Sequence, residues 1–401
     1  MGRYARLESA LDLSQLMERH YAEALDTRHG RPVAWVNAGA PVELLRAMGV
    51  LPVYPENYAA MCGVRGAVWL CEAAEREGYS RDLCSYARIS LGAGLSGPSA
   101  PQQGLGRPDL LISCNNSCGT VVKWFEALAR LYGVPLFVLD TPFVHDELPA
   151  HTVAYVAAQL QDLIHWLEAR AGCHLNSAAL EEALRLSRET TLLWREIREL
   201  CRTVPSPLNA PDLFIHMAPI VVLRGSPEAA AYYRRLRREV QQRVRQGAGG
   251  IPNERYRLLW DNIAIWPRLS RLFYLFAARG ACFVVDTYTG AWDAVPEEGD
   301  PLESLARVYT EIYLNRSLAY RLGRMQQLMR EYSCHGFLMH NNRSCKAFSL
   351  GQPVARRELT AATGAPGLLL EADMCDTRAY AEEQIRTRVE AFLETLAGRA
   401  G

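Results

Sequence analysis

The stretch PDLLISCNNSCGTVVKWFEALARLYGVPLFVLDTP, residues 108–142, decides the fold. Its first part contains the apolar run LLIS and predicts a strand. Residues 118–133 carry apolar side chains at helical spacing and end on a glycine, and residues 134–142 predict the next strand. A strand, a helix and a second strand in this order are typical of a parallel sheet that helices cover on both faces.

The same alternation of predicted strands and helices recurs on both sides of a long helical stretch. Further strands are predicted at 31–39, 49–55, 255–263, 280–290, 336–342 and 364–373. Residues 151–250 instead have helical spacing, and the chain ends in a helix at 379–398. We therefore predict an α/β fold with a helical domain between two parallel-sheet domains. The predicted domains are an N-terminal α/β domain with leading helices at 1–150, a helical domain at 151–250 and a C-terminal α/β domain at 251–401.

Composition excludes several classes of protein. The 401 residues include 44 Lys and Arg against 44 Asp and Glu, so there is no basic excess for binding nucleic acid. No stretch approaches the roughly 20 apolar residues of a membrane span, and the N-terminal stretch lacks the apolar core of a signal peptide. We therefore expect a cytoplasmic protein. Its 11 cysteines are then buried thiols, metal ligands or redox groups rather than disulfides.

Polar and sulfur-bearing side chains follow the predicted strands in both halves. In open parallel sheets, ligands bind beyond the carboxyl ends of the strands. If the two halves face each other, these side chains line one cleft. The side chains in question belong to Asn37, Glu56, Asn57, Cys114, Asn115, Asn116, Cys118, Asp140, Asp286, Tyr288, His340, Cys345, Asp373 and Cys375.

The cysteines divide by their context. Five are expected to pack in the core: Cys71, Cys173, Cys201, Cys282 and Cys334. Six lie in predicted loops beside polar residues or glycine: Cys62, Cys84, Cys114, Cys118, Cys345 and Cys375. Three to six loop thiolates that converge on a cleft suit an iron–sulfur cluster, with zinc as the alternative on spacing alone. The chain contains no CxxC pair and no phosphate-binding loop.

Seven motifs together resemble the iron–sulfur subunits of the 2-hydroxyacyl-CoA dehydratase and benzoyl-CoA reductase family. They are YPENYAA (54–60), GYSRDLCSYAR (78–88), PDLLISCNNSCGTVVKWFE (108–126), VPLFVLDTP (134–142), NERYRLLWDNI (253–263), HNNRSCKAFSLGQ (340–352) and EADMCDTRAYAEEQIRTRVEAFLE (371–394). The resemblance covers nearly the whole chain. It implies two flavodoxin-like α/β domains with a helical domain, in agreement with the pattern of strands and helices.

The resemblance also implies a [4Fe-4S] cluster that only three cysteines bind. By their place in the motifs these are Cys84, Cys118 and Cys345. The fourth iron is left open for water, sulfide or substrate. The implied activity is low-potential one-electron chemistry on an acyl-CoA thioester, as a lyase or an oxidoreductase. A separate ATP-hydrolysing iron–sulfur activator supplies the electron, and the assembly contains a related second subunit or a second copy of the chain.

Cys62, Cys114 and Cys375 leave alternatives open. Three further cysteines suit a double-cubane [8Fe-9S] cluster, which a branch of the family carries and uses to reduce small molecules with ATP-dependent electron delivery. In the other interpretation these three are buried thiols beside a single cluster. A further alternative is that the chain is a partner subunit that only relays electrons.

Two other residues are candidate catalytic groups. Glu56 either handles protons near the substrate or only favours the N-terminus of a helix. His340 either hydrogen-bonds a cluster sulfide or moves a proton, or it is a structural histidine. Asn115 and Asn116 are expected to be turn residues that tolerate a left-handed backbone.

Overall fold

Two four-stranded parallel sheets form the framework of the computed structural model, which describes residues 7–26 and 30–400. The first sheet contains β1 (Val33–Val36), β2 (Leu51–Val53), β3 (Leu110–Cys114) and β4 (Leu136–Leu139). The second contains β5 (Tyr256–Asp261), β6 (Ala281–Asp286), β7 (Gly336–Asn342) and β8 (Gly367–Ala372). All eight strands lie within the predicted ranges, which confirms the α/β fold.

Both sheets have the same strand order. The first runs β2-β1-β3-β4 and the second runs β6-β5-β7-β8, which is the start of the flavodoxin-like order. The order therefore reverses between β1 and β3 in one half and between β5 and β7 in the other. In such sheets a ligand binds in the crevice beyond the switch point. The loops after these four strands are the place where the fold favours a site.

The strands are short apolar runs because both faces of each sheet are covered. In β1, Ala34 and Val36 belong to one cluster of buried side chains, whereas Val33 and Trp35 belong to another. Each cluster also contains side chains of β5, such as Leu259 in the first. The two halves therefore share a continuous core rather than meeting across a polar surface.

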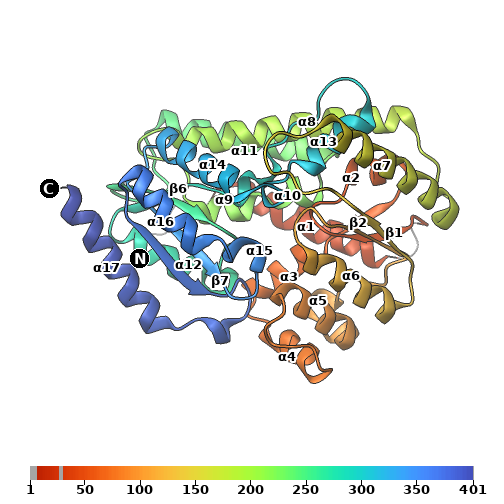
Figure 1. Cartoon of the computed structure of the whole chain (residues 1–401), viewed down its shortest axis with the longest axis horizontal. Helices are drawn as coiled ribbons and strands as arrows, with labels where there is room; N and C mark the ends of the chain where they lie inside the picture. The colour runs from red at the N-terminus through yellow and green to blue at the C-terminus, as the bar shows by residue number, and fades with distance from the viewer. Residues whose placement is uncertain (1–6, 27–29, 401) are drawn as a thin grey trace.

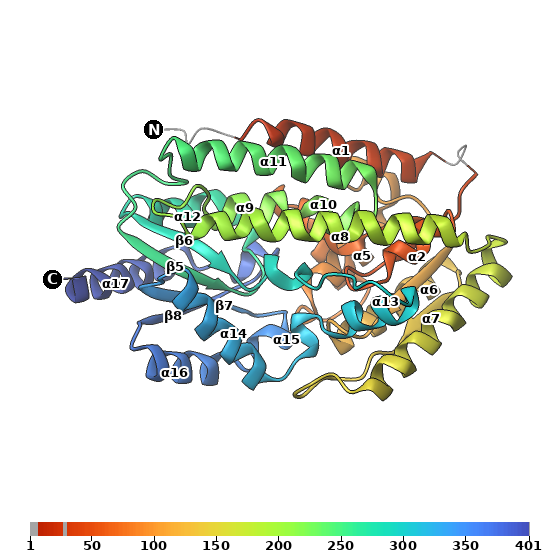
Figure 2. The same cartoon turned by 90° about the horizontal axis from the view of Figure 1, so that it is seen from above.

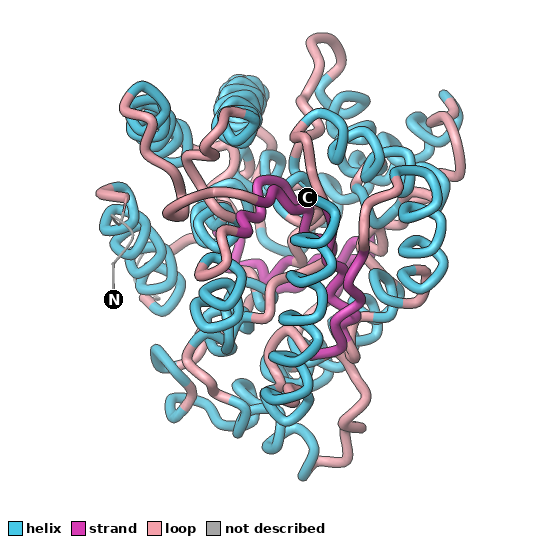
Figure 3. The backbone as a smooth tube through the Cα atoms, turned by 90° about the vertical axis from the view of Figure 1, so that its left-hand side faces the viewer, coloured by secondary structure: helices cyan, strands magenta, loops and turns pink. Residues whose placement is uncertain are grey.

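Helices enclose both sheets, which lie at the centre of the molecule in Figures 1 and 3. In the first half they are α1 (Ser9–Leu25), α2 (Val42–Ala47), α3 (Pro55–Val64), α4 (Val68–Arg76), α5 (Ser85–Ser96) and α6 (Gly119–Tyr132). In the second half they are α12 (Leu269–Ala277), α13 (Pro301–Thr310), α14 (Leu318–Glu331), α15 (Lys346–Ser349), α16 (Gln352–Thr363) and α17 (Glu382–Ala400). In the described part of the chain, no helix is long and apolar enough to cross a membrane.

Between the two sheet-forming segments the chain is helical. The helices there are α7 (Ala150–Ala171), α8 (Ser177–Glu199), α9 (Ala210–His216), α10 (Ala218–Val222) and α11 (Pro227–Arg245). α8 and α11 run side by side along the molecule and reach both halves (Figures 1 and 2). Periodicity predicts α7, α8 and α11, but it does not reveal α9 and α10, which follow a proline-rich stretch. The domain boundaries at 150 and 250 remain predictions.

A buried ion pair fastens the first half to the helices around it. The carboxylate of Glu43 in α2 accepts hydrogen bonds from Arg224 Nε at 3.0 Å, Ser187 Oγ at 2.6 Å and Tyr309 OH at 2.6 Å. Burial opposes ionisation of Glu43, but Arg224 and the two hydroxyls outweigh it and lower the pKa of this carboxyl. Glu43 therefore ties together α2, α8, α13 and the loop after α10 as a charged group.

Replacing Glu43 with Gln keeps its shape but leaves Arg224 buried without a counter-charge. We expect the free energy of unfolding to fall by about 3–5 kcal/mol, measured by anaerobic urea unfolding followed by circular dichroism. The matched control is Glu23→Gln, because Glu23 forms an exposed ion pair with Arg31. This control is expected to cost less than about 1 kcal/mol. If the two variants unfolded at the same urea concentration, the structural role of Glu43 would be contradicted.

Candidate functional site

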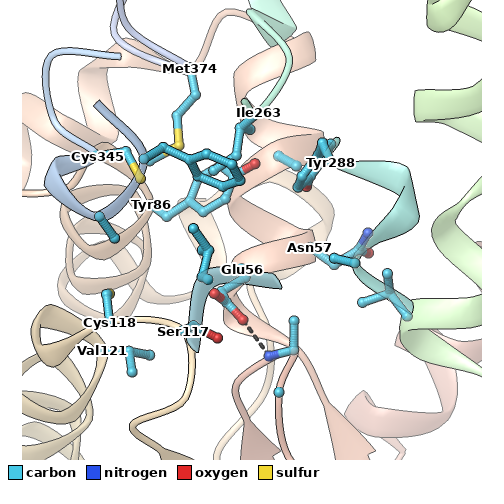
Figure 4. A pocket seen from close by; sticks show the side chains of 18 of the residues that line it. Glu56, Asn57, Tyr86, Ser117, Cys118, Val121, Ile263, Tyr288, Cys345 and Met374 are labelled. Carbon is cyan, nitrogen blue, oxygen red and sulfur yellow. Dashed lines mark hydrogen bonds between the residues drawn. The ribbon is translucent and has the colours of Figure 1, made fainter. Parts of the chain in front are cut away.

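The carboxyl ends of both sheets face one cavity (Figure 4). Residues that follow β1, β3, β5 and β7 contribute to its wall, so the two switch points open into the same space. This confirms the predicted cleft at the sheet edges. The side of the cavity nearest the sheets is lined by Ala38, Gly39, Glu56, Asn57, Cys84, Tyr86, Ser117, Cys118, Ile263, Cys345 and Met374.

Three of the predicted loop cysteines line this cavity, and each lies directly before a helix. Cys84 is the N-cap residue of α5, Cys118 that of α6 and Cys345 that of α15. Backbone N–H groups at the start of these helices act to lower the pKa values of all three thiols, which favours the thiolate form. The first half supplies two of the sulfurs and the second half supplies the third.

Asparagine side chains hold the loop that carries Cys118. Asn116 Nδ2 donates to two backbone carbonyls, at 2.8 and 2.9 Å. Asn115 Oδ1 accepts from the backbone N–H and from the hydroxyl of Thr141, each at 2.7 Å. Both asparagines lie in a turn, as predicted, but neither has a positive φ. Side-chain hydrogen bonds, rather than an unusual backbone, give the loop its shape.

A chain of hydrogen bonds joins the loops of Cys84 and Cys345 across the two halves. Ser344 Oγ accepts from Ser85 N at 3.1 Å and donates to Asp373 Oδ2 at 2.5 Å. Ser85 follows Cys84 in the sequence and Ser344 precedes Cys345, so these bonds hold two sulfur-bearing loops together. Both serines and Asp373 are buried, which shields the bonds from water.

Burying an unpaired thiolate charge in this cavity costs free energy. Burial raises the pKa of Cys345 to about 12, and it also raises the pKa values of Cys84 and Cys118. The N–H groups of the helices act in the opposite direction without offsetting burial. A cysteine in such a place ionises when a metal or a cation compensates its charge. The three sulfurs are therefore suited to binding metal rather than to acting as free nucleophiles.

A buried cation lies beside this group. Arg321 of α14 is 8% exposed, and it donates to the backbone carbonyls of Ala347 and Phe348, in the turn after Cys345, at 3.2 and 3.4 Å. Its charge lowers the pKa of Cys345, against the effect of burial. Arg321 is not identifiable from the sequence, because nothing in the pattern of α14 links it to a distant cysteine loop. Its contacts arise only when α14 packs against α15.

Among the described residues that line the cavity, Glu56 is the only carboxylate. It lies in the first turn of α3, and the backbone N–H of Ala38 donates to its Oε2, as the dashed line in Figure 4 shows. Burial raises the pKa of Glu56 to about 7, while the hydrogen bond from Ala38 lowers it by less. A carboxyl group with a pKa near neutral is suited to both giving and taking a proton. Glu56 occupies the helix N-terminus and the cavity wall at once.

The other candidates lie outside the cavity wall. His340 is fully buried in β7, with its Nδ1 2.7 Å from the backbone carbonyl of Ile263, and it does not line the cavity. Cys114 ends β3, and its sulfur lies 3.9 Å from the hydroxyl of Thr141. Cys62 and Cys375 are each 1% exposed. These four side chains do not line the cavity, which differs from the expected position in the cleft. His340 and Cys114 lie on strands that end at the sheet edge, but their side chains are buried in the core.

The described side chains do not form a ready-made site for a single metal ion. Within the described residues, no three His, Cys, Asp or Glu side chains are placed to hold one metal ion, as zinc would require. In a cubane each cysteine binds a different iron, so the sulfurs need only surround a shared space.

Comparisons with known proteins show which family the chain belongs to. A family model described as 2-hydroxyglutaryl-CoA dehydratase, D-component, matches residues 37–396. The chain is 32% identical over 397 residues to the (R)-2-hydroxyisocaproyl-CoA dehydratase alpha subunit of Clostridioides difficile, which covers 98% of this chain and 97% of the relative. It is 31% identical over 374 residues to the (R)-phenyllactyl-CoA dehydratase alpha subunit of Clostridium sporogenes, with 92% and 91% covered. It is also 30% identical over 371 residues to one of the subunits of benzoyl-CoA reductase from Thauera aromatica, with 88% and 85% covered. The chain therefore belongs to the 2-hydroxyacyl-CoA dehydratase and benzoyl-CoA reductase family.

Proposed function

We propose that the chain is the cluster-bearing subunit of a 2-hydroxyacyl-CoA dehydratase, in which Cys84, Cys118 and Cys345 hold a [4Fe-4S] cluster. The observation that carries the proposal is the meeting of three cysteines, each at the start of a helix, in one cavity between the two sheets. The family model and two of the relatives are dehydratases, which favours a lyase over a reductase.

The protein surroundings suit an anionic cluster. Three protein ligands leave one iron with an open position, and the bound cluster then supplies a Lewis acid and low-potential one-electron chemistry. The N-termini of α5 and α6 and the positive charge of Arg321 favour negative charge at this place. The largely apolar wall of the cavity limits the access of water to the cluster and the substrate.

Glu56 is the group that we assign to proton transfer. Dehydration takes the hydroxyl from C2 and a hydrogen from C3 of the 2-hydroxyacyl thioester, and it gives a 2-enoyl thioester and water without net oxidation. Glu56 accepts the proton from C3 and returns a proton to the leaving hydroxyl oxygen. The backbone N–H of Ala38 holds Oε2, which leaves Oε1 for the substrate.

Two protein partners belong to this proposal. The electron comes from a separate iron–sulfur activator that hydrolyses ATP, since the sequence contains no phosphate-binding loop of its own. A related second subunit or a second copy of the chain completes the enzyme, because two of the relatives are named as alpha subunits.

The double-cubane alternative is not part of the proposal. Cys114 packs against Thr141, Cys62 is buried within α3, and Cys375 contacts the backbone carbonyl of Ala59, so none of the three sulfurs lines the cavity. A subunit that only relays electrons would need no proton-handling group beside its cluster. The place of Glu56 in the cavity wall therefore favours a catalytic subunit.

Replacing Cys84, Cys118 or Cys345 with alanine removes one proposed iron ligand. We expect the anaerobically purified wild type to contain about four irons per chain and each of these variants to lose most of its iron. Cys282→Ala is the matched control, since this sulfur is buried on β6 outside the cavity. Iron and sulfide analysis of the folded proteins checks the prediction. Iron that stays in the Cys345→Ala variant would refute the ligand assignment, and about eight irons per chain would indicate two cubanes.

Replacing Glu56 with Gln removes the proton acceptor but keeps the shape of the side chain. We expect kcat for dehydration to fall by about 10²–10⁴-fold, while the iron content stays at the wild-type value. Formation of the 2-enoyl thioester, followed by mass spectrometry, gives the rate. Glu126→Gln, which changes an exposed carboxylate paired with Lys123, is expected to keep full activity. Full activity of the iron-loaded Glu56→Gln variant would show that another group moves the proton.

A further inference from the structure

Away from the sheet edges, the cavity extends between the helical segment and the second half. Its wall there includes side chains of α9 and α10, of η6 (Thr289–Trp292), of η7 (Tyr313–Asn315) and of the turns beside them. These side chains are mainly aliphatic or aromatic. The largest of them belong to Phe214, Met217, Trp266, Tyr288, Trp292 and Tyr313.

This wall offers no positive charge. Among the described residues that line the cavity there is no lysine, arginine or histidine, and Glu56 is the only carboxylate. An acyl chain that ends in a second carboxylate would therefore be buried without a counter-charge, at a much higher cost than a hydrocarbon end of similar size.

The cations behind the wall are already engaged. Arg198 of α8 lies behind η6 and forms an ion pair with Asp293. Arg321 stacks on the rings of Tyr313 and Phe348, with distances of 5.3 and 5.4 Å to the centroids, and its N–H groups donate to backbone carbonyls. Turning either guanidinium into the cavity would break these contacts. For Arg198 it would leave Asp293 with only its longer ion pair, to Arg324 at 3.6 Å.

We propose that the acyl group that this site takes is uncharged and apolar, with a branched alkyl or aryl end, and that thioesters of 2-hydroxy dicarboxylic acids are excluded. The inference rests on the proposed function and adds the chemical class of the substrate. It follows from two features of the same cavity, namely its aliphatic and aromatic wall and the presence of Glu56 as its only fixed carboxylate.

The test compares two thioesters on the iron-loaded, full-length protein. (R)-2-hydroxyisocaproyl-CoA and (R)-2-hydroxyglutaryl-CoA share the CoA and the 2-hydroxy thioester, and they differ in the end of the acyl chain. Anaerobic isothermal titration calorimetry gives both Kd values, so the ratio isolates the acyl end. We expect the apolar thioester to bind at least about 100-fold more tightly, since the carboxylate is left unpaired.

A variant with a positive charge in the cavity wall gives a second test of the same inference. Met217→Lys is expected to reduce the ratio of the two Kd values by at least about tenfold, because an ammonium now faces the acyl end. Leu11→Lys, at a position that is 61% exposed on α1, is the matched control and is expected to leave the ratio unchanged. If Met217→Lys fails to fold, the comparison on the wild type alone decides the question.

The outcomes separate this inference from the function on which it rests. Tighter binding of the apolar thioester supports the proposal. Equal binding of both thioesters, or tighter binding of the glutaryl thioester, overturns the inference and leaves the dehydratase proposal intact. If the iron-loaded protein binds neither thioester, both proposals are overturned, because the site then does not take 2-hydroxyacyl-CoA.

Discussion

The site depends on one constraint, which is that two parallel sheets must present their carboxyl ends to the same space. Cys84 and Cys118 belong to one half and Cys345 to the other, so a shift between the halves would separate the sulfurs. The core that the halves share resists such a shift, as do the buried Glu43–Arg224 pair and the hydrogen bonds that join the cysteine loops. The geometry of the site is therefore a property of the whole fold.

Electrostatics explains why such a cavity suits a cluster. Burial alone keeps the thiols protonated, whereas helix N-termini and Arg321 favour negative charge at the same place. Iron that binds the thiolates removes the remaining cost of burying their charge. Burial in this apolar cavity raises the pKa of Glu56 to about 7. In the proposed function the same low polarity shields the cluster from water and disfavours a charged acyl end. In this proposal, cluster binding, proton transfer and substrate choice share one physical cause.

Patterns within short windows predicted much of this structure. All eight strands were identifiable because each is an apolar run that is followed by polar residues, and Cys84, Cys118 and Cys345 were identified through motifs around loops that end at helices. Side-chain direction was harder to predict. His340 and Cys114 lie on strands at the correct edge but point into the core. The position of Arg321 depends on the packing of α14 against α15, which no local pattern records.

The most direct test of the account is the position of iron in crystals grown without oxygen. An anomalous difference map recorded at the iron absorption edge locates the metal without reference to any assumed ligand. The account predicts one compact group of iron peaks in the cavity that Cys84, Cys118 and Cys345 line, with Arg321 nearby. Iron beside Cys62 or Cys375, or a lone metal peak outside this cavity, would contradict it.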